Sequence, residues 1–129
     1  MKFLALAAIG GAIGASGRYL VGTAALRLFG SGYPWGTLIV NIVGALLMGI
    51  LIELMALKYS GSQELRIFLA TGILGGFTTF SAFSLEVAMM IERGHWSEAG
   101  IYILASVTLT IAALFVGLYL VRSTYGVSL

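Results

Sequence analysis

Four long apolar segments make up almost the whole chain, and they restrict the fold more than any other feature. The segments run from about Phe3 to Phe29, Trp35 to Tyr59, Glu64 to Ile91 and Ser97 to Val121. Each exceeds the ~20 residues that a helix needs to cross ~30 Å of hydrocarbon. Only helices satisfy their own backbone hydrogen bonds in lipid, so the pattern predicts an all-α membrane protein with four transmembrane helices.

The scarcity of charge supports the same conclusion. Charged residues are 9% of the 129, and the mean hydropathy is +1.05. A soluble domain carries about 25% charge, so we expect one integral membrane domain over residues 1–129 and no separate soluble domain. The N-terminus resembles a signal peptide, but its apolar stretch continues to about Leu28, which is long enough to span the membrane.

Several function classes are disfavoured by what the chain contains. It has no basic cluster, so nucleic acid is not expected as a partner. It has no Cys and a single His, His95, which we expect in a loop, so a metal site built from side chains is not expected. The sequence shows no Ser-His-Asp arrangement and no phosphate loop. These observations argue against an enzyme.

The distribution of basic residues sets the orientation poorly. Four helices place both termini on one side, and the basic residues divide between the two sides with a weak bias. One side would hold Lys2, Lys58, Arg66 and Arg122, and the other Arg27 and Arg93, plus Arg18 if it is counted. Two explanations stay open: the count is too small to be informative, or the protein inserts in both orientations.

Two polar residues lie inside predicted membrane helices. Arg18 lies well inside the first segment, where an Arg marks a function or an interior partner unless its side chain snorkels to the interface. Asn41 lies among Leu, Ile and Val in the second segment, on one face with Thr37 and Gly44. Its amide needs partners away from lipid, which a helix–helix hydrogen bond or a pore would provide.

Small and hydroxyl residues form two further patterns. Gly10 and Gly14 are spaced for close helix packing in the first segment. In the fourth segment, Tyr102, Ser106 and Thr110 follow each other at intervals of four and form one polar stripe. Such hydroxyls either bond back to their own helix or line a polar path.

The stretch Gly75–Ser84, GGFTTFSAFS, is unusual in a membrane helix. Gly75 and Gly76 each weaken a helix by ~1 kcal/mol relative to Ala. Thr78 and Thr79 are β-branched and weaken it further. We therefore expect a break in the third helix, at which unwound carbonyl oxygens suit a dehydrated alkali cation.

Phe80 and Phe83 share a face just after this predicted break. Their ring edges carry partial positive charge and suit an anion, although core packing explains the two rings equally well. Glu86 follows them and is the only acid in a membrane interior.

The same stretch resembles the third-helix signature of the Fluc (CrcB) fluoride channels. The resemblance extends over essentially the whole chain and includes Arg18, Trp35-Gly36-Thr37, Asn41 and Glu86. It implies a passive fluoride channel of the bacterial plasma (inner) membrane, multi-pass and in contact with lipid, that lets fluoride leave the cytoplasm. It further implies an antiparallel dual-topology homodimer with two pores.

The resemblance also implies roles for individual residues. A structural sodium ion, not transported, would be held by backbone carbonyls of Gly75 and Thr78 from each subunit. The fluoride paths would be lined by Phe80, Phe83, Asn41, Ser81, Thr79, Tyr102, Ser106 and Thr110. The pore mouth would hold Arg18, Thr37 and Glu86.

This sequence departs from the family pattern at Ala82, where relatives commonly have Thr, and the polar stripe ends at Leu114, where some have another hydroxyl. Two other readings compete with the channel. A small dual-topology, proton-coupled multidrug exporter needs a carboxylate in its first helix, and this first segment has none. A non-transporting assembly subunit would not conduct after purification.

Overall fold

The computed structural model describes residues 1–59 and 62–125, apart from the side chains of Lys58 and Tyr59. The charge expected at Lys58 and the position of the Tyr59 side chain therefore lie outside the described part. The elements in chain order are α1 (Lys2–Phe29), α2 (Trp35–Leu54), the π-helix η1 (Met55–Tyr59), α3 (Gln63–Arg66), the π-helix η2 (Ile67–Leu74), α4 (Gly75–Phe77), α5 (Phe80–Glu92) and α6 (Trp96–Thr124).

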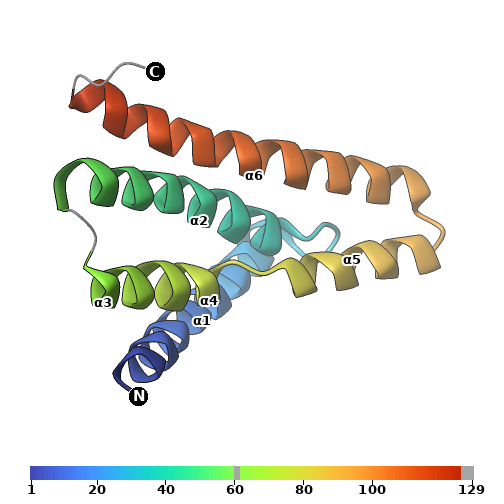
Figure 1. Ribbon diagram of the computed structural model, residues 1–129. Coiled ribbons are helices and arrows are strands. Elements are labelled where there is room, and N and C mark those ends of the chain that lie inside the picture. Colours follow the sequence, from blue (N-terminus) through green and yellow to red (C-terminus); the bar gives the residue numbers. More distant parts are fainter. Residues whose placement is uncertain (60–61, 126–129) are drawn as a thin grey trace.

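The predicted number of membrane helices is confirmed. Four helical stretches are long and apolar enough to cross a membrane, namely Lys2–Phe29, Trp35–Leu57, Gln63–Glu92 and Trp96–Thr124. The described residues contain no strand. Both ends of the chain lie at one end of the helices, and the α1–α2 loop and the α5–α6 turn lie towards the other (Figure 1).

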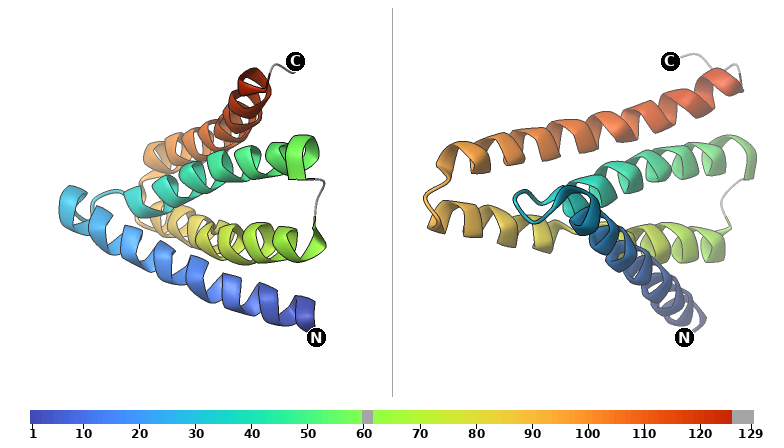
Figure 2. Two further views of the ribbon diagram at one scale, coloured as in Figure 1. Left: turned by 90° about the vertical axis from the view of Figure 1, so that its left-hand side faces the viewer. Right: turned by 180° about the vertical axis from the view of Figure 1, so that it is seen from behind.

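The helices pack in two pairs. α2 runs beside α6, whereas α1 crosses at an angle and packs on η2 and α4, as the two further views in Figure 2 also show. Between α2 and α6, a Cβ on Gly117 would overlap the Leu46 carbonyl oxygen, and one on Gly49 would overlap that of Leu114. Lipid supplies no hydrophobic force between helices, so this close backbone packing is a main source of their association.

Glycines also bring α1 against the third membrane segment. A Cβ on Gly10 would lie 2.6 Å from the Phe68 carbonyl oxygen and 2.9 Å from the Gly72 Cα atom. A Cβ on Gly14 would overlap the carbonyl oxygen of Ile73. The packing role expected for Gly10 and Gly14 is confirmed.

Two residues with extended backbone separate α4 from α5. Thr78 has φ −88° and ψ 156°, and Thr79 has φ −152° and ψ 116°. Gly75 (φ −63°, ψ −36°) and Gly76, the two residues expected to weaken the helix, are themselves helical. The β-branched threonines prefer extended backbone, and Gly76 is needed for packing, since a Cβ there would lie 2.6 Å from the Gly11 carbonyl oxygen.

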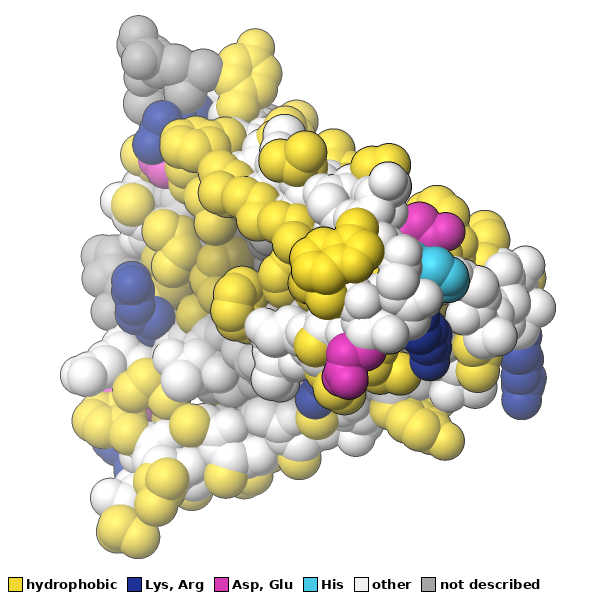
Figure 3. Space-filling model, turned by 90° about the vertical axis from the view of Figure 1, so that its right-hand side faces the viewer, with side chains coloured by type: hydrophobic (Ala, Val, Ile, Leu, Met, Phe, Trp, Pro, Cys, Tyr) yellow, Lys and Arg dark blue, Asp and Glu magenta, His cyan; other side chains and the backbone are white. Residues whose placement is uncertain are grey.

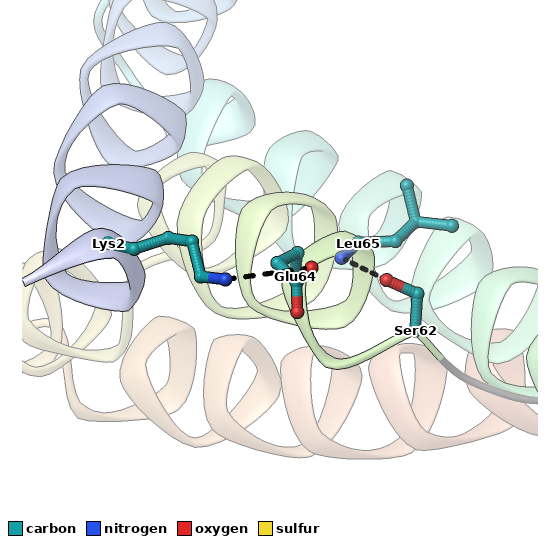
Figure 4. A network of polar contacts seen from close by, with 4 residues as sticks. All are labelled: Lys2, Ser62, Glu64 and Leu65. Atoms are coloured by element: carbon teal, nitrogen blue, oxygen red, sulfur yellow. Dashed lines mark hydrogen bonds and ion pairs between the residues drawn. The ribbon is translucent and has the colours of Figure 1, made fainter.

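Two charged pairs lie at the end of the bundle where α1 begins and α6 ends. Lys2 Nζ lies 4.0 Å from Glu64 Oε2, and Ser62 caps α3 by accepting a hydrogen bond from the Leu65 N–H at 3.3 Å (Figure 4). Nearer the core, Arg122 Nη2 lies 3.1 Å from Glu53 Oε1, which joins α6 to α2. The Lys2–Glu64 pair is exposed and contributes little to stability, whereas Glu53 is buried and depends on its partner.

Candidate functional site

Asn41 of α2 holds the extended residues in place. Its Nδ2 donates to the Thr79 carbonyl oxygen at 3.1 Å, and its Oδ1 accepts from the Thr79 N–H at 2.8 Å. The side chain thus binds both backbone polar groups of Thr79. The helix–helix hydrogen bond that the sequence left open for Asn41 is therefore present.

At the interruption between α4 and α5, formed by the extended residues Thr78 and Thr79, backbone N–H groups bind side chains. In a continuous helix the Thr79 N–H would donate to the Gly75 carbonyl, but it donates to Asn41. The Ala82 N–H would donate to the Thr78 carbonyl, but it donates to Thr79 Oγ1 at 3.1 Å, which caps α5. The carbonyl oxygens of Gly75 and Thr78 thereby lose their usual i+4 donors, as carbonyls at a helix end do, and the neighbouring Gly76 carbonyl oxygen accepts from Arg18.

Arg18 of α1 has an interior partner. Its Nε donates to the Gly76 carbonyl oxygen at 3.1 Å, and the side chain is partly buried. The sequence left open whether Arg18 has an interior partner or snorkels to the interface, and the structure shows an interior partner. The guanidinium also places a positive charge one residue from Gly75.

The Glu86 carboxylate joins three helices. Thr37 Oγ1 of α2 donates to Glu86 Oε2 at 2.8 Å, and the Tyr102 hydroxyl of α6 donates to Glu86 Oε1 at 2.7 Å. Tyr102 is fully buried, in one core cluster with Leu38, Phe83, Met90 and Ala99. Each carboxylate oxygen thus accepts a hydrogen bond from a neutral donor of a neighbouring helix.

A cavity of about 360 Å³ lies between α2, α5 and α6 beside the extended residues. Its polar lining includes Ser106 Oγ, which is buried and has no hydrogen-bond partner among the described residues. No Asp, Glu, Lys or Arg is among the lining residues, which are Asn41, Gly44, Ala45, Met48, Thr78, Thr79, Phe80, Phe83, Ser106, Val107, Thr110, Ile111 and Leu114.

The two phenylalanines differ in their surroundings. Their ring centroids lie 5.5 Å apart, so Phe80 and Phe83 form a pair as their spacing predicts. Phe83 is 8% exposed and belongs to the core, whereas Phe80 is 76% exposed. A packing role within one chain accounts for Phe83 and does not account for Phe80.

Two further cavities lie on other sides of α2. One of about 300 Å³ lies between α1, α2 and α5 and is lined by Arg18, Thr37, Thr79 and Ala82 among others. Another of about 520 Å³ lies below the α1–α2 loop and is lined by Thr37 and Glu86. Thr79 lines both the 360 Å³ and the 300 Å³ cavity, and Thr37 lines both the 300 Å³ and the 520 Å³ cavity.

The 520 Å³ cavity has a charged rim that was not predicted from the sequence. Arg93, His95 and Glu98 line it, and His95 Nδ1 lies 3.6 Å from Glu98 Oε2. In Figure 3 the His side chain, in cyan, lies beside an acidic side chain at this end of the molecule. Only the position of these residues around the α5–α6 turn could have signalled this rim in the sequence.

Not all expected path residues meet in one place. Ser81 lines none of the three cavities, and its Oγ lies 3.3 Å from Thr79 Oγ1 on an exposed part of α5. Ser106 and Thr110 line the 360 Å³ cavity, whereas Tyr102 is in the core at Glu86. Tyr33, in the loop before α2, is half-buried and contacts Tyr102.

Comparisons with known proteins agree on one family. Residues 5–118 match the family model described as CrcB-like protein, Camphor Resistance (CrcB). A protein of Chelativorans sp. (strain BNC1), named fluoride-specific ion channel FluC, is 58% identical over 123 residues, which are 95% of this chain and 98% of that protein. Proteins of the same name in Agrobacterium fabrum and Caulobacter sp. (strain K31) are 54% and 53% identical and are matched over 98% and 100% of their length.

Proposed function

The chain belongs to the CrcB-like family, and we propose that it is a passive fluoride-selective channel of the bacterial plasma (inner) membrane. Fluoride would leave the cytoplasm through it, which lowers fluoride toxicity. The observation that supports this most is the 360 Å³ cavity, which offers hydrogen-bond donors and ring edges and no charged side chain. Anionic walls would repel fluoride, and cationic walls would trap it.

The lining supplies several weak contacts for a small anion. Ser106 Oγ is buried and has a proton to donate. The Asn41 amide carries two N–H groups, and one of them is used on Thr79. The edges of Phe80 and Phe83 add partial positive charge. Conduction needs binding that admits the ion without retaining it, which such a set of neutral contacts provides.

We propose a structural sodium ion at the interruption. The carbonyl oxygens of Gly75 and Thr78 are freed from their helical donors, and hard oxygen ligands suit a small cation. Among the described residues there is no group of His, Cys, Asp or Glu that could hold a metal, so the ligands would be backbone atoms. The ion would supply a fixed positive charge, which offsets part of the cost of fluoride in a low-dielectric interior.

An antiparallel, dual-topology homodimer would complete the site. Gly75 and Thr78 of one chain would contribute two carbonyl oxygens, and a second chain related by two-fold symmetry would contribute two more. Phe80 is largely exposed beside the cavity, and a Cβ on Gly75 would meet only the Ala70 carbonyl oxygen, at an ordinary 3.4 Å. These residues therefore form a surface that a second copy can cover. The weak bias of basic residues suits insertion in both orientations.

The substitution Gly75→Val tests this dimer. The chain itself has room for the added side chain, so the variant should fold as a helical monomer, lose the dimer on size exclusion with light scattering, and lose fluoride flux. Gly100→Val is the matched control, because nothing lies within 4 Å of a Cβ at Gly100. A Gly75→Val protein that is dimeric and conducts like the wild type would contradict the proposal.

The outer cavities would serve as the mouth of the path. Arg18, in the lining of the 300 Å³ cavity, would attract the anion. Thr37 and Glu86 both line the 520 Å³ cavity. Because both Glu86 oxygens already accept hydrogen bonds, part of the carboxylate charge is compensated at that point.

Fluoride efflux from liposomes tests the function. The purified protein should release fluoride down its gradient, with chloride retained and without dependence on a proton gradient, as measured with a fluoride electrode. Efflux that requires a proton gradient, or export of cationic drugs, would favour the exporter, although α1 has no carboxylate for proton exchange. No efflux from a properly folded dimer would leave only the assembly subunit.

A further inference from the structure

The loop before α2 holds Tyr33 in a fixed place. Trp35 N–H donates to the Tyr33 carbonyl oxygen at 2.8 Å, and Pro34 between them has φ −80° and ψ 64°. These values describe an inverse γ-turn, in which the pyrrolidine ring of Pro34 fixes φ. Tyr33 is thereby joined rigidly to the N-terminus of α2, the helix that carries Thr37.

The Tyr33 ring contacts Trp35 on one side and belongs to a series of aromatic contacts that reaches the cavity. Its centroid lies 5.5 Å from that of Tyr102 at an interplanar angle of 81°, an edge-to-face contact. Tyr102 lies 5.2 Å from Phe83, and Phe83 lies 5.5 Å from Phe80. The series thus connects the loop on the outside of the bundle with the two rings that line the 360 Å³ cavity.

Tyr102 is the member of this series with a polar task. Its hydroxyl donates to Glu86 Oε1 at 2.7 Å, while the ring contacts both Tyr33 and Phe83. A shift of this ring would alter the hydrogen bond to Glu86 and the position of Phe83 at the same time. Edge-to-face pairs have a preferred geometry that an aliphatic side chain cannot reproduce.

We propose that Tyr33 is a positioning residue for the anion path, acting through Tyr102. Its edge contact holds the Tyr102 ring so that the hydroxyl stays on Glu86 and the ring stays against Phe83. Tyr33 itself lines the 520 Å³ cavity, and this role does not require it to touch the ion in the 360 Å³ cavity. This inference rests on the proposed fluoride channel and names a residue outside the path residues considered so far.

The Tyr33 hydroxyl is not required by this role. Burial and the nearby Glu98 carboxylate raise the pKa of Tyr33 above its ordinary value of 10.0, so the ring is neutral at physiological pH. Tyr33→Phe keeps the ring and its edge, whereas Tyr33→Leu keeps apolar bulk without them. The two variants separate the ring contact from the hydroxyl and from simple space filling.

The experiment measures fluoride efflux of purified variants in liposomes, together with the dimer fraction on size exclusion. An edge contact of about 0.5–1.5 kcal/mol corresponds to about 2- to 10-fold, which is the loss of flux we expect in Tyr33→Leu at unchanged dimer fraction. Tyr33→Phe should conduct like the wild type. Phe29→Leu is the matched control, because Phe29 contacts Trp35 in the same region and makes no ring contact with Tyr102.

A double-mutant cycle with Tyr102→Phe tests the route through Tyr102. The Phe ring keeps its contact with Phe83 but has no hydroxyl for Glu86, so adding Tyr33→Leu to Tyr102→Phe should reduce flux less than it does alone, by the share of the effect that acts through Glu86. Equal losses in both backgrounds would overturn the proposal and leave a general structural role. If Tyr33→Leu does not assemble, Tyr33→Met fills the space more flexibly and takes its place in the cycle.

Two outcomes separate this inference from the function it rests on. Wild-type protein that conducts no fluoride would refute the channel and, with it, this role of Tyr33. Wild-type conduction with unchanged flux in Tyr33→Leu would refute the positioning role alone. A loss in Tyr33→Phe as large as in Tyr33→Leu would also overturn it, because the hydroxyl and not the ring edge would then be the active feature.

Discussion

Replacing Asn41 with Leu should separate α2 from the interruption between α4 and α5. The Asn41 side chain makes two hydrogen bonds, of 3.1 Å and 2.8 Å, to the carbonyl and the N–H of Thr79. Leu has nearly the same size but leaves the Thr79 N–H and the Thr79 carbonyl without the Asn41 side chain as a partner. The backbone there cannot return to a helix without moving the cap of α5, so relief by rearrangement is restricted.

The size of the effect follows from these two bonds. Hydrogen bonds between membrane helices average ~0.6 kcal/mol with a maximum of ~1.7, so losing two should lower the free energy of unfolding by about 1–3 kcal/mol. Asn41→Asp keeps an acceptor for the Thr79 N–H and loses the donor to the carbonyl, so its cost from lost hydrogen bonds should be about half. Its flux should nevertheless fall further as pH rises, because a larger ionised fraction places negative charge beside the cavity.

Both quantities can be measured on the same preparations. Unfolding in mixed micelles, followed by circular dichroism during titration with a denaturing detergent, gives the difference in stability, and efflux from liposomes gives the function. Thr23→Val is the control, because the Thr23 hydroxyl donates only to Tyr19 of its own helix. The reasoning fails if Asn41→Leu is as stable as Thr23→Val, or if Asn41→Asp conducts normally at every pH.

Three further predictions follow from the packing, the rings and the proposed ion. Gly10→Ala should lower stability by about 1–3 kcal/mol, because its Cβ would meet backbone at 2.6 Å, whereas Gly11→Ala next to it, with nothing within 4 Å, should be neutral or stabilising; equal thermal shifts would contradict this. Phe80→Ile and Phe83→Ile should abolish most fluoride flux in liposomes, and only the variant at the buried Phe83 should also lower thermal stability; normal flux in both would leave packing alone. Exhaustive replacement of sodium by a large organic cation should stop flux in the wild type and in Thr78→Ser alike, because the ligands are backbone atoms; undiminished flux would exclude the ion.

The membrane helices were predictable because length and hydropathy determine them. A long apolar segment with so few charges favours lipid, and in lipid it has to be helical, so the number of spans follows without knowledge of the packing. The close packing at Gly10 and Gly14 was also readable, because small residues four apart form a continuous strip on a helix. These features depend on one segment at a time.

The site was predictable only in part, since its geometry depends on contacts between segments. The stretch Gly75–Ser84 indicated a weak helix, but the sequence could not show which residues would be extended. Thr78 and Thr79 are the extended residues because Gly76 packs against α1 and Asn41 binds the backbone N–H and carbonyl of Thr79. The contact between Tyr33 and Tyr102 was not predictable for a similar reason, because an aromatic residue near a helix end has the same local sequence whether or not its ring packs on a core Tyr.

The bond between Arg18 and the Gly76 carbonyl has a consequence for synthesis of the chain. The two residues are separated by 58 positions, so Arg18 reaches the membrane well before its acceptor has been made. At ~5–20 residues per second, the ribosome needs roughly 3–12 s to add that length. During this interval the guanidinium has no Gly76 carbonyl to bind, and α1 must hold it near water or close to the translocon. We therefore expect the nascent first helix to lie shallow or tilted in the membrane until the third segment has been inserted.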